Sequence, residues 1–160
     1  NRLLAMRRTG YRPGQPISEV GINAQPQEDK AAQVLVSLKH MDKWHERRKK
    51  ISEYYDSRLQ DVEKRSSPKY SQTNYHKYCI FVQNKLDFAS TMLKSGVECH
   101  LHYTYNFAET EVLQGPVWLD GDYANTKYFV EHAVNLPVNP WLSDAEVETV
   151  ADKVRANYFI

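Results

Sequence analysis

Apolar residues recur every three or four positions in the segment that runs from Pro26 to Leu59. They are Ala31, Val34, Leu35, Leu38, Met41, Trp44, Ile51, Tyr55 and Leu59. This spacing places them on one stripe of an α-helix, which only Arg48 interrupts. Pro26 suits the first position of a helix, because its missing N–H needs no partner there. The pattern predicts one long amphipathic helix near the N-terminus, and its length favours a kink near His40–Asp42.

Two later segments alternate between apolar and polar residues, as β-strands do. They are Tyr75–Val82 and Val97–Tyr103, and a helical pattern over residues 86–95 separates them. In the second segment two sets of side chains face opposite ways: Val97, Cys99, Leu101 and Tyr103 on one side, and Glu98, His100 and His102 on the other. Gly96 is a typical helix stop. The order predicts a strand–helix–strand unit.

The remainder of the chain contains two further helices. One is expected over about residues 122–133, followed by an extended, proline-containing segment at 134–140. The other starts at Ser143, which forms an S-x-x-E capping box with Glu146. Residues 61–73 and 104–121 read as loop and irregular structure. The predicted fold is therefore α+β, with a small mixed sheet flanked by helices.

Two parts of the chain differ in composition. Residues 1–25 contain four arginines, and glycines and prolines break any long helix there, so this part reads as a connector. Residues 26–160 then form one small α+β domain. The first residue is Asn rather than Met, which fits a truncated, fragmentary or processed chain.

Composition excludes some classes of partner. Hydrophobic residues make up 41% and charged residues 26% of the chain, as in soluble globular proteins. The formal net charge of +1 gives no electrostatic argument for binding nucleic acid or a membrane surface. No apolar run approaches the ~20 residues that span a bilayer. Cys79 and Cys99 form no disulfide framework, and free thiols favour a cytoplasmic location.

Residues alone indicate no self-sufficient active site. His100 and His102 form an H-x-H pair, but no third ligand has a recognisable spacing, so we expect no metal. No Ser/His/Asp or Cys/His arrangement and no glycine-rich phosphate loop is present. One cluster of cations remains open to two interpretations, an anion-binding patch or a solvated helix face: Lys43, Arg47, Arg48, Lys49 and Lys50.

Several segments, taken in order, resemble the DegT/StrS family of sugar aminotransferases. They are Gly21-Ile22-Asn23-Ala24-Gln25 before the long helix, Tyr75-His76-Lys77-Tyr78-Cys79-Ile80, Ser95-Gly96-Val97-Glu98 with His102-Tyr103, Asn135-Leu136-Pro137-Val138-Asn139-Pro140, and Leu142-Ser143-Asp144-Ala145-Glu146-Val147. Each segment alone is weak evidence, but together they cover residues ~20–158. The resemblance is to the C-terminal portion of these enzymes.

The resemblance implies a fold-type I enzyme that depends on pyridoxal 5′-phosphate (PLP). Such an enzyme moves an amino group from an amino-acid donor to a keto-sugar nucleotide, for amino-sugar biosynthesis. The family's catalytic lysine lies upstream of the matching region, so this chain contains no catalytic residue and does not bind PLP covalently. We therefore expect the chain to be the small C-terminal domain of a homodimeric enzyme and to be inactive by itself.

Three residues take roles from the resemblance. Asn23 matches a family asparagine that contacts the PLP phosphate of the neighbouring subunit, although a turn asparagine before a helix is the simpler interpretation. His102 and Tyr103 match a His-Tyr pair near the sugar-nucleotide site, and ordinary packing at a strand end is their alternative. Gln25 stands where the family often has arginine, which puts anion contacts at that position in doubt.

A second hypothesis belongs to a different class of function. A free-standing domain of this kind could be a non-catalytic binding or dimerisation module, or a truncated fragment derived from the family. A third, weaker hypothesis is a split enzyme whose other half is a separate chain.

Overall fold

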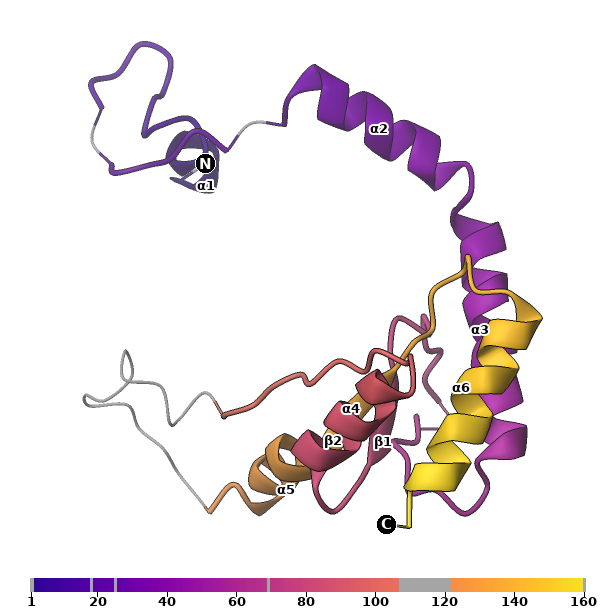
Figure 1. Ribbon diagram of the computed structural model, residues 1–160. Helices are drawn as coiled ribbons and strands as arrows, with labels where there is room; N and C mark the ends of the chain where they lie inside the picture. Colours follow the sequence, from indigo (N-terminus) through magenta and orange to yellow (C-terminus); the bar gives the residue numbers. More distant parts are fainter. Residues whose placement is uncertain (1, 18, 25, 69, 107–121, 160) are drawn as a thin grey trace. The chain divides into compact units, whose positions relative to one another are not determined.

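The computed structural model describes residues 2–17, 19–24, 26–68, 70–106 and 122–159 (Figure 1). Its elements, in chain order, are α1 (Arg2–Met6), α2 (Glu28–Leu38), α3 (Met41–Arg58), β1 (Tyr78–Phe81), α4 (Lys85–Lys94), α5 (Ala124–His132), β2 (Ala133–Leu136) and α6 (Asp144–Asn157). The chain divides into two compact units, Asn1–Asp42 and Lys43–Ile160. Each unit is described by itself.

Backbone hydrogen bonds hold the first unit together. They join the end of α1 and the turn after it to the segment that precedes α2. Ile22 N donates to Met6 O at 2.8 Å, and Ala24 N donates to Arg7 O at 2.9 Å. The two stretches meet so closely that a Cβ at Gly21 would overlap the main chain of Met6. Glycine is required at that contact, which is a more specific role than the helix breaker predicted from the sequence.

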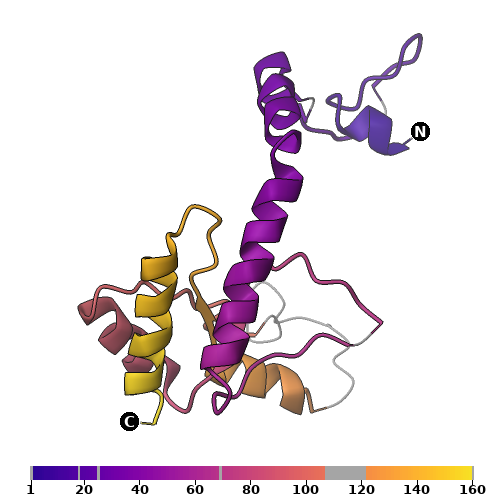
Figure 2. The ribbon, with the colours of Figure 1, turned by 90° about the vertical axis from the view of Figure 1, so that its right-hand side faces the viewer.

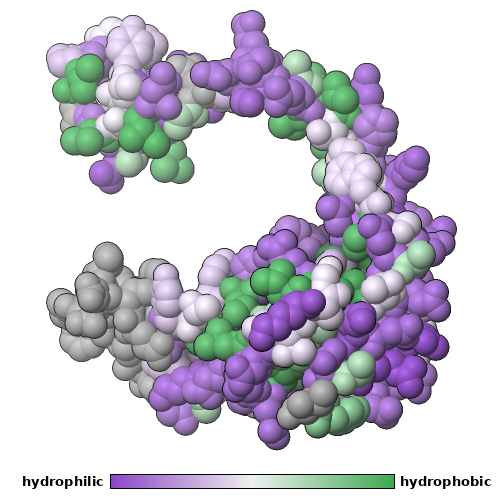
Figure 3. All heavy atoms as spheres, viewed as in Figure 1, coloured by the Kyte–Doolittle hydropathy of each residue, from purple (hydrophilic) through white to green (hydrophobic). Residues whose placement is uncertain are grey.

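Two helices, α2 and α3, replace the single long helix that the sequence predicts. Lys39 N bonds to Val36 O and His40 N to Ser37 O, so these bonds span three residues and end the α-helical pattern. The break thus lies next to the predicted kink. Helix α2 has no buried residue, and hydrophobic residues are visible at its surface and at that of α1 (Figure 3). The prediction of one long amphipathic helix is therefore wrong, because the segment forms two helices.

In the second unit, β1 and β2 form a two-stranded antiparallel sheet. Cys79 lies opposite Asn135, and Ile80 opposite Val134. A single antiparallel bridge flanks each strand, from Lys64 to Ile80 and from His100 to Asn135. The prediction of a mixed sheet is wrong for the part of the chain that the structure describes, because every pairing within it is antiparallel.

The predicted strand Val97–Tyr103 is reduced to the bridge at His100. Continuing that ladder would pair Glu98 with Pro137, and proline has no N–H to donate. The carbonyl oxygen of Pro137 instead accepts a hydrogen bond from the Tyr55 hydroxyl at 2.8 Å. The predicted alternation of side chains holds only in part. Val97 is buried, but Tyr103 is 68% exposed, although the sequence pattern predicts that both face the same way.

One face of the sheet carries the core of the second unit. Helices α3, α4 and α6 pack on this face (Figures 1 and 2). The core residues at the centre are less than 2% exposed: Ile51, Tyr55, Leu59, Ile80, Met92, Val134 and Val154. The Tyr55 ring meets the Tyr78 ring edge-on, with ring centroids 5.1 Å apart. Burial of this kind is the main stabilising contribution to such a domain.

Local signals place the helices of the second unit well. Ser143 and Glu146 form both halves of the predicted capping box at the start of α6. Helix α4 ends at Lys94, one residue before the predicted end, and α5 lies within the predicted range. Most of the predicted irregular stretch, residues 107–121, lies outside the described residues. Among the described residues, no helix is both long and apolar enough to cross a membrane.

Candidate functional site

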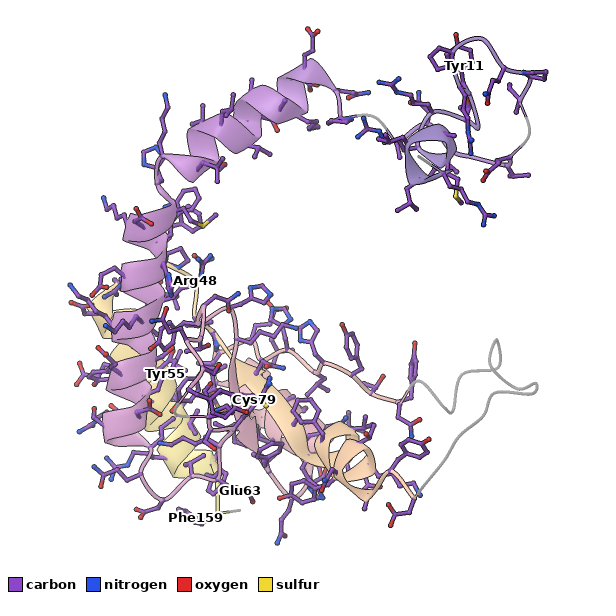
Figure 4. The ribbon with its side chains drawn as sticks, turned by 180° about the vertical axis from the view of Figure 1, so that it is seen from behind. Tyr11, Arg48, Tyr55, Glu63, Cys79 and Phe159 are labelled. Atoms are coloured by element: carbon purple, nitrogen blue, oxygen red, sulfur yellow. The ribbon has the colours of Figure 1, made fainter. Side chains whose placement is uncertain are left out.

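The second face of the sheet borders a polar cavity of about 890 Å³. Cys79 from β1 and Asn135 from β2 both line it, and His102 and Tyr103 approach it from the segment after α4. Figure 4 shows Cys79 on the sheet and Tyr55 on α3. Ser52 also lines the cavity, and its buried hydroxyl has no hydrogen-bond partner among the described residues. The cavity can therefore accept a polar molecule.

His102 is held by the side chain of Asn135. The amide nitrogen Nδ2 of Asn135 lies 3.4 Å from His102 Nδ1 and donates to the His100 carbonyl oxygen at 3.2 Å. Partial burial lowers the pKa of His102 below its ordinary value, and the nearby Lys77, His100 and His76 lower it further. The lowered pKa favours the neutral form of His102.

The Tyr103 ring contacts the His102 ring, and the main chain of Tyr103 is held by a hydrogen bond. The two rings meet edge-on, with centroids 5.5 Å apart. The Lys85 ammonium donates to Tyr103 O at 3.0 Å and also to Val130 O, although Lys85 is only 7% exposed. Burial lowers the pKa of Lys85, and Glu131 partly opposes that shift. The structure thus brings His102 and Tyr103 together, with the Tyr103 ring left exposed.

A second cavity, of about 740 Å³, lies on the other side of His102. Arg48, His76 and Lys77 line it together with His102 and Asn135. Arg48, labelled in Figure 4, is the residue that interrupts the apolar stripe of α3, and its side chain lines this cavity. Two carboxylates, Glu98 and Glu146, line the same cavity, so Arg48 and Lys77 offer a local place for an anionic group within a wall of mixed charge.

Other candidates from the sequence have different roles. His100 and His102 have ring centroids 5.8 Å apart, but no group of three or more potential metal ligands occurs within the described ranges. Arg47, one of the clustered cations, is half-buried and already engaged. Its guanidinium bonds to Asp144 at 2.7 Å and to Leu142 O at 2.6 Å, which fastens α3 to the start of α6.

The two thiols are poor nucleophiles. Burial raises the pKa of Cys99 to about 11, and Glu98 adds to that effect. Burial likewise raises the pKa of Cys79 above its ordinary value. Both remain protonated at neutral pH, and a protonated thiol neither attacks an electrophile nor binds a metal well.

Asn23 lies in the first unit, next to a separate small cavity of about 460 Å³. Its main chain forms an antiparallel bridge with Arg8, and Arg8, Thr9 and Tyr11 complete the lining. A guanidinium, a phenol and an amide can all donate hydrogen bonds to an anion, and none of the described residues that line the cavity is a carboxylate. This donor set fits a phosphate group. Gln25, the predicted departure from the family pattern, lies outside the described residues.

Residues 1–155 match the DegT/DnrJ/EryC1/StrS aminotransferase family. The chain belongs to this family. Two similar curated proteins are EryC1, the erythromycin biosynthesis sensory transduction protein of Saccharopolyspora erythraea, and the dTDP-3-amino-3,4,6-trideoxy-alpha-D-glucose transaminase of Streptomyces venezuelae. The first is 25% identical over 144 residues, covering 85% of this chain and 38% of EryC1. The second is 23% identical over 157 residues, covering 96% of this chain and 41% of the transaminase.

The structural likeness to the family is close. A DegT/DnrJ/EryC1/StrS aminotransferase from Brucella abortus superposes with a TM-score of 0.87 at 19% identity, covering 98% of this chain and 43% of that protein. This likeness shows a shared fold. The chain therefore spans about 40% of the length of the family members that it matches.

The sequence gives no role to three residues that the structure places beside these candidate residues. Asn135 belongs to a predicted extended segment and to one of the family-like segments, and a polar residue inside the apolar run Val134–Leu136 is a signal for a buried hydrogen bond. Arg8 was counted as connector charge, and only its pairing with Asn23 shows its relevance. Lys85 stands at the start of a helix, where sequence gives no sign that it is buried.

Proposed function

We propose that this chain is the C-terminal part of a PLP-dependent aminotransferase that acts on keto-sugar nucleotides. The family match over residues 1–155 carries this proposal, and the name of the Streptomyces venezuelae relative supports the substrate class. Bound PLP supplies the carrier for the amino group between an amino-acid donor, such as glutamate, and the keto-sugar. The catalytic lysine belongs to a part of the enzyme outside this chain, so the chain alone is inactive.

Asn23 is the proposed cofactor contact. Its amide donates to the PLP phosphate of the neighbouring subunit, so the enzyme is a homodimer in which residues 1–25 connect the two domains. The cavity around Asn23 supports this role, because Arg8 and Tyr11 offer two further donors to the same phosphate. No residue of this chain forms a covalent bond to the cofactor.

His102 and Tyr103 are the proposed contacts to the sugar nucleotide. Both border the cavity of about 890 Å³, and His102 also borders the one of about 740 Å³, which Arg48 and Lys77 line as well. Sugar hydroxyls and diphosphate oxygens both need hydrogen-bond donors, which these walls supply. The cytoplasmic location stays a prediction from the sequence.

Two substitutions in the whole enzyme separate these roles. Asn23→Ala removes a hydrogen bond to a charged group, which costs about 1.5–3 kcal/mol, so PLP affinity falls roughly 10- to 100-fold. His102→Ala raises KM for the sugar nucleotide and leaves PLP bound. Titration of apo-enzyme with PLP and steady-state kinetics measure the two effects.

Matched controls are available for both substitutions. Gln27→Ala changes an exposed amide at the start of α2, and His45→Ala removes an exposed histidine that lines neither cavity. Normal PLP affinity in Asn23→Ala, or loss of PLP in His102→Ala, would contradict the assigned roles. A whole protein that binds neither PLP nor sugar nucleotide would favour the non-catalytic module instead.

A further inference from the structure

Asn135 is a buried polar residue whose side chain connects two other parts of the site. It is 5% exposed and lies in β2, opposite Cys79. Its backbone exchanges two hydrogen bonds with His100, of 3.0 and 2.9 Å, which fix β2 against the segment that carries His102. The Asn135 side chain therefore reaches His102 from a rigid position.

The hydrogen bonds determine which way the Asn135 amide faces. A main-chain carbonyl oxygen can only accept, so the atom 3.2 Å from His100 O must be the amide NH₂. Turning the amide over would place two acceptor oxygens against each other and lose that bond. The second hydrogen of the NH₂ group is then directed to His102 Nδ1, at 3.4 Å.

This arrangement also determines the proton on His102. A nitrogen that accepts a hydrogen bond carries no hydrogen, so the neutral ring has its proton on Nε2. Within the described part of the chain, Nε2 of His102 has no hydrogen-bond partner. That nitrogen is the group left to meet a ligand.

We propose that Asn135 is a positioning residue that fixes His102 as the neutral tautomer with its proton on Nε2, so that His102 offers the substrate one hydrogen-bond donor and no positive charge. The inference rests on the proposed function, in which His102 contacts the sugar nucleotide. A neutral donor suits an uncharged acceptor, such as a hydroxyl or keto oxygen of the sugar. The phosphates are matched by Arg48 and Lys77 instead.

Lys77, His76 and His100 act in the same direction, whereas the carboxylates that line the two cavities favour a charged ring. Lys77 and His76 precede β1, His100 lies on the segment of His102 itself, and all three oppose a second positive charge on the ring. Further charged groups line the two cavities that His102 borders: Arg48, Glu98, Glu146, Asp56, Lys64 and Arg65. Glu146 is engaged by Ser143 in the capping box.

Nitrogen NMR of the chain labelled with ¹⁵N-histidine tests the proposal directly. Long-range ¹H–¹⁵N correlations distinguish the two neutral tautomers and follow the protonation of each ring with pH. We expect His102 of the unmodified chain to show the Nε2–H form alone near neutral pH. A proton on Nδ1, or a mixture of tautomers, would overturn the proposal without any variant.

Asn135→Asp provides a second test with the same side-chain shape. A carboxylate accepts and cannot donate, so His102 gains a proton on Nδ1 and its pKa rises by about one unit or more. Asn139→Asp is the matched control, because it adds the same charge to the wall of the 740 Å³ cavity without a bond to His102. Equal shifts in both variants would overturn the proposal. If Asn135→Asp does not fold, the spectrum of the unmodified chain still decides.

The test is independent of the proposed function. The spectra require neither PLP nor substrate, so the wrong tautomer would refute the role of Asn135 and leave the enzyme assignment standing. Conversely, a sugar nucleotide that binds the whole enzyme without shifting the His102 signals would refute the substrate contact and leave the tautomer established.

Discussion

Helices α2 and α3 derive from one apolar stripe in the sequence but differ in what covers it. In α3 and the residue after it, Ile51, Tyr55 and Leu59 are at most 1% exposed. In α2, Val34 and Leu35 are 57% and 63% exposed. The same spacing of apolar residues thus occurs both in a helix that packs on the core and in one whose apolar residues are exposed. Periodicity identifies the apolar face of a helix, whereas burial depends on residues far away in the sequence.

Leucine-to-alanine substitutions should show the largest difference between the two helices. Leu59→Ala removes a buried side chain and should lower the free energy of unfolding by about 2–5 kcal/mol. Leu35→Ala removes an exposed one and should change it by less than about 0.5 kcal/mol. Urea unfolding of both variants measures the pair. Similar costs would show that the face of α2 is covered in solution.

The hydroxyl of Tyr55 should contribute the next largest effect. Tyr55→Phe removes the hydrogen bond to the half-buried carbonyl oxygen of Pro137, which costs about 1–1.5 kcal/mol. Tyr54→Phe is the control, since the Tyr54 hydroxyl has no hydrogen-bond partner among the described residues. Equal stability of the two variants would contradict the stabilising role given to the bond from Tyr55 to Pro137.

The helix starts differ in the same way and should give a smaller effect. Ser143 caps α6 with its side chain, whereas Gln27 at the start of α2 makes no side-chain capping bond. Ser143→Ala should cost about 1 kcal/mol, and Gln27→Ala should be close to neutral. Thermal or urea unfolding compares them. If Gln27→Ala lowered the free energy of unfolding as much as Ser143→Ala does, the Gln27 side chain would have to cap α2 in solution.

The smallest effect should be a pH dependence of that cap. Hydrogen bonds from the Ser143 side chain and backbone lower the pKa of Glu146 below its ordinary value of 4.5. A lowered carboxyl pKa stabilises the fold above the ordinary value, and this contribution is lost as the pH falls through the lowered one. The difference in unfolding free energy between Ser143→Ala and the unmodified chain should therefore shrink in acid. A difference that is constant with pH would exclude the carboxylate from the cap.

The features that sequence predicted well depend on neighbouring residues. The capping box at Ser143 and Glu146 involves positions three apart, and α4 and α5 follow local periodicity. The predicted strand at Val97–Tyr103 is reduced to the bridge at His100, and toward Glu98 its ladder ends at Pro137, which is remote in the sequence. The family motif identified His102 and Tyr103 as candidates. Their contacts to Asn135 and Lys85 required the folded chain.

Lys85 has a consequence for the chemical labelling of this protein. Its ammonium is buried and bonded to the carbonyl oxygens of Tyr103 and Val130, so reagents that acylate lysines must wait until that segment opens. Once the segment opens, the burial that lowers the pKa of Lys85 is removed, and the freed amine reacts like an ordinary lysine. The rate at which Lys85 is modified, relative to exposed lysines, therefore reports how often the segment that carries Tyr103 detaches from the fold.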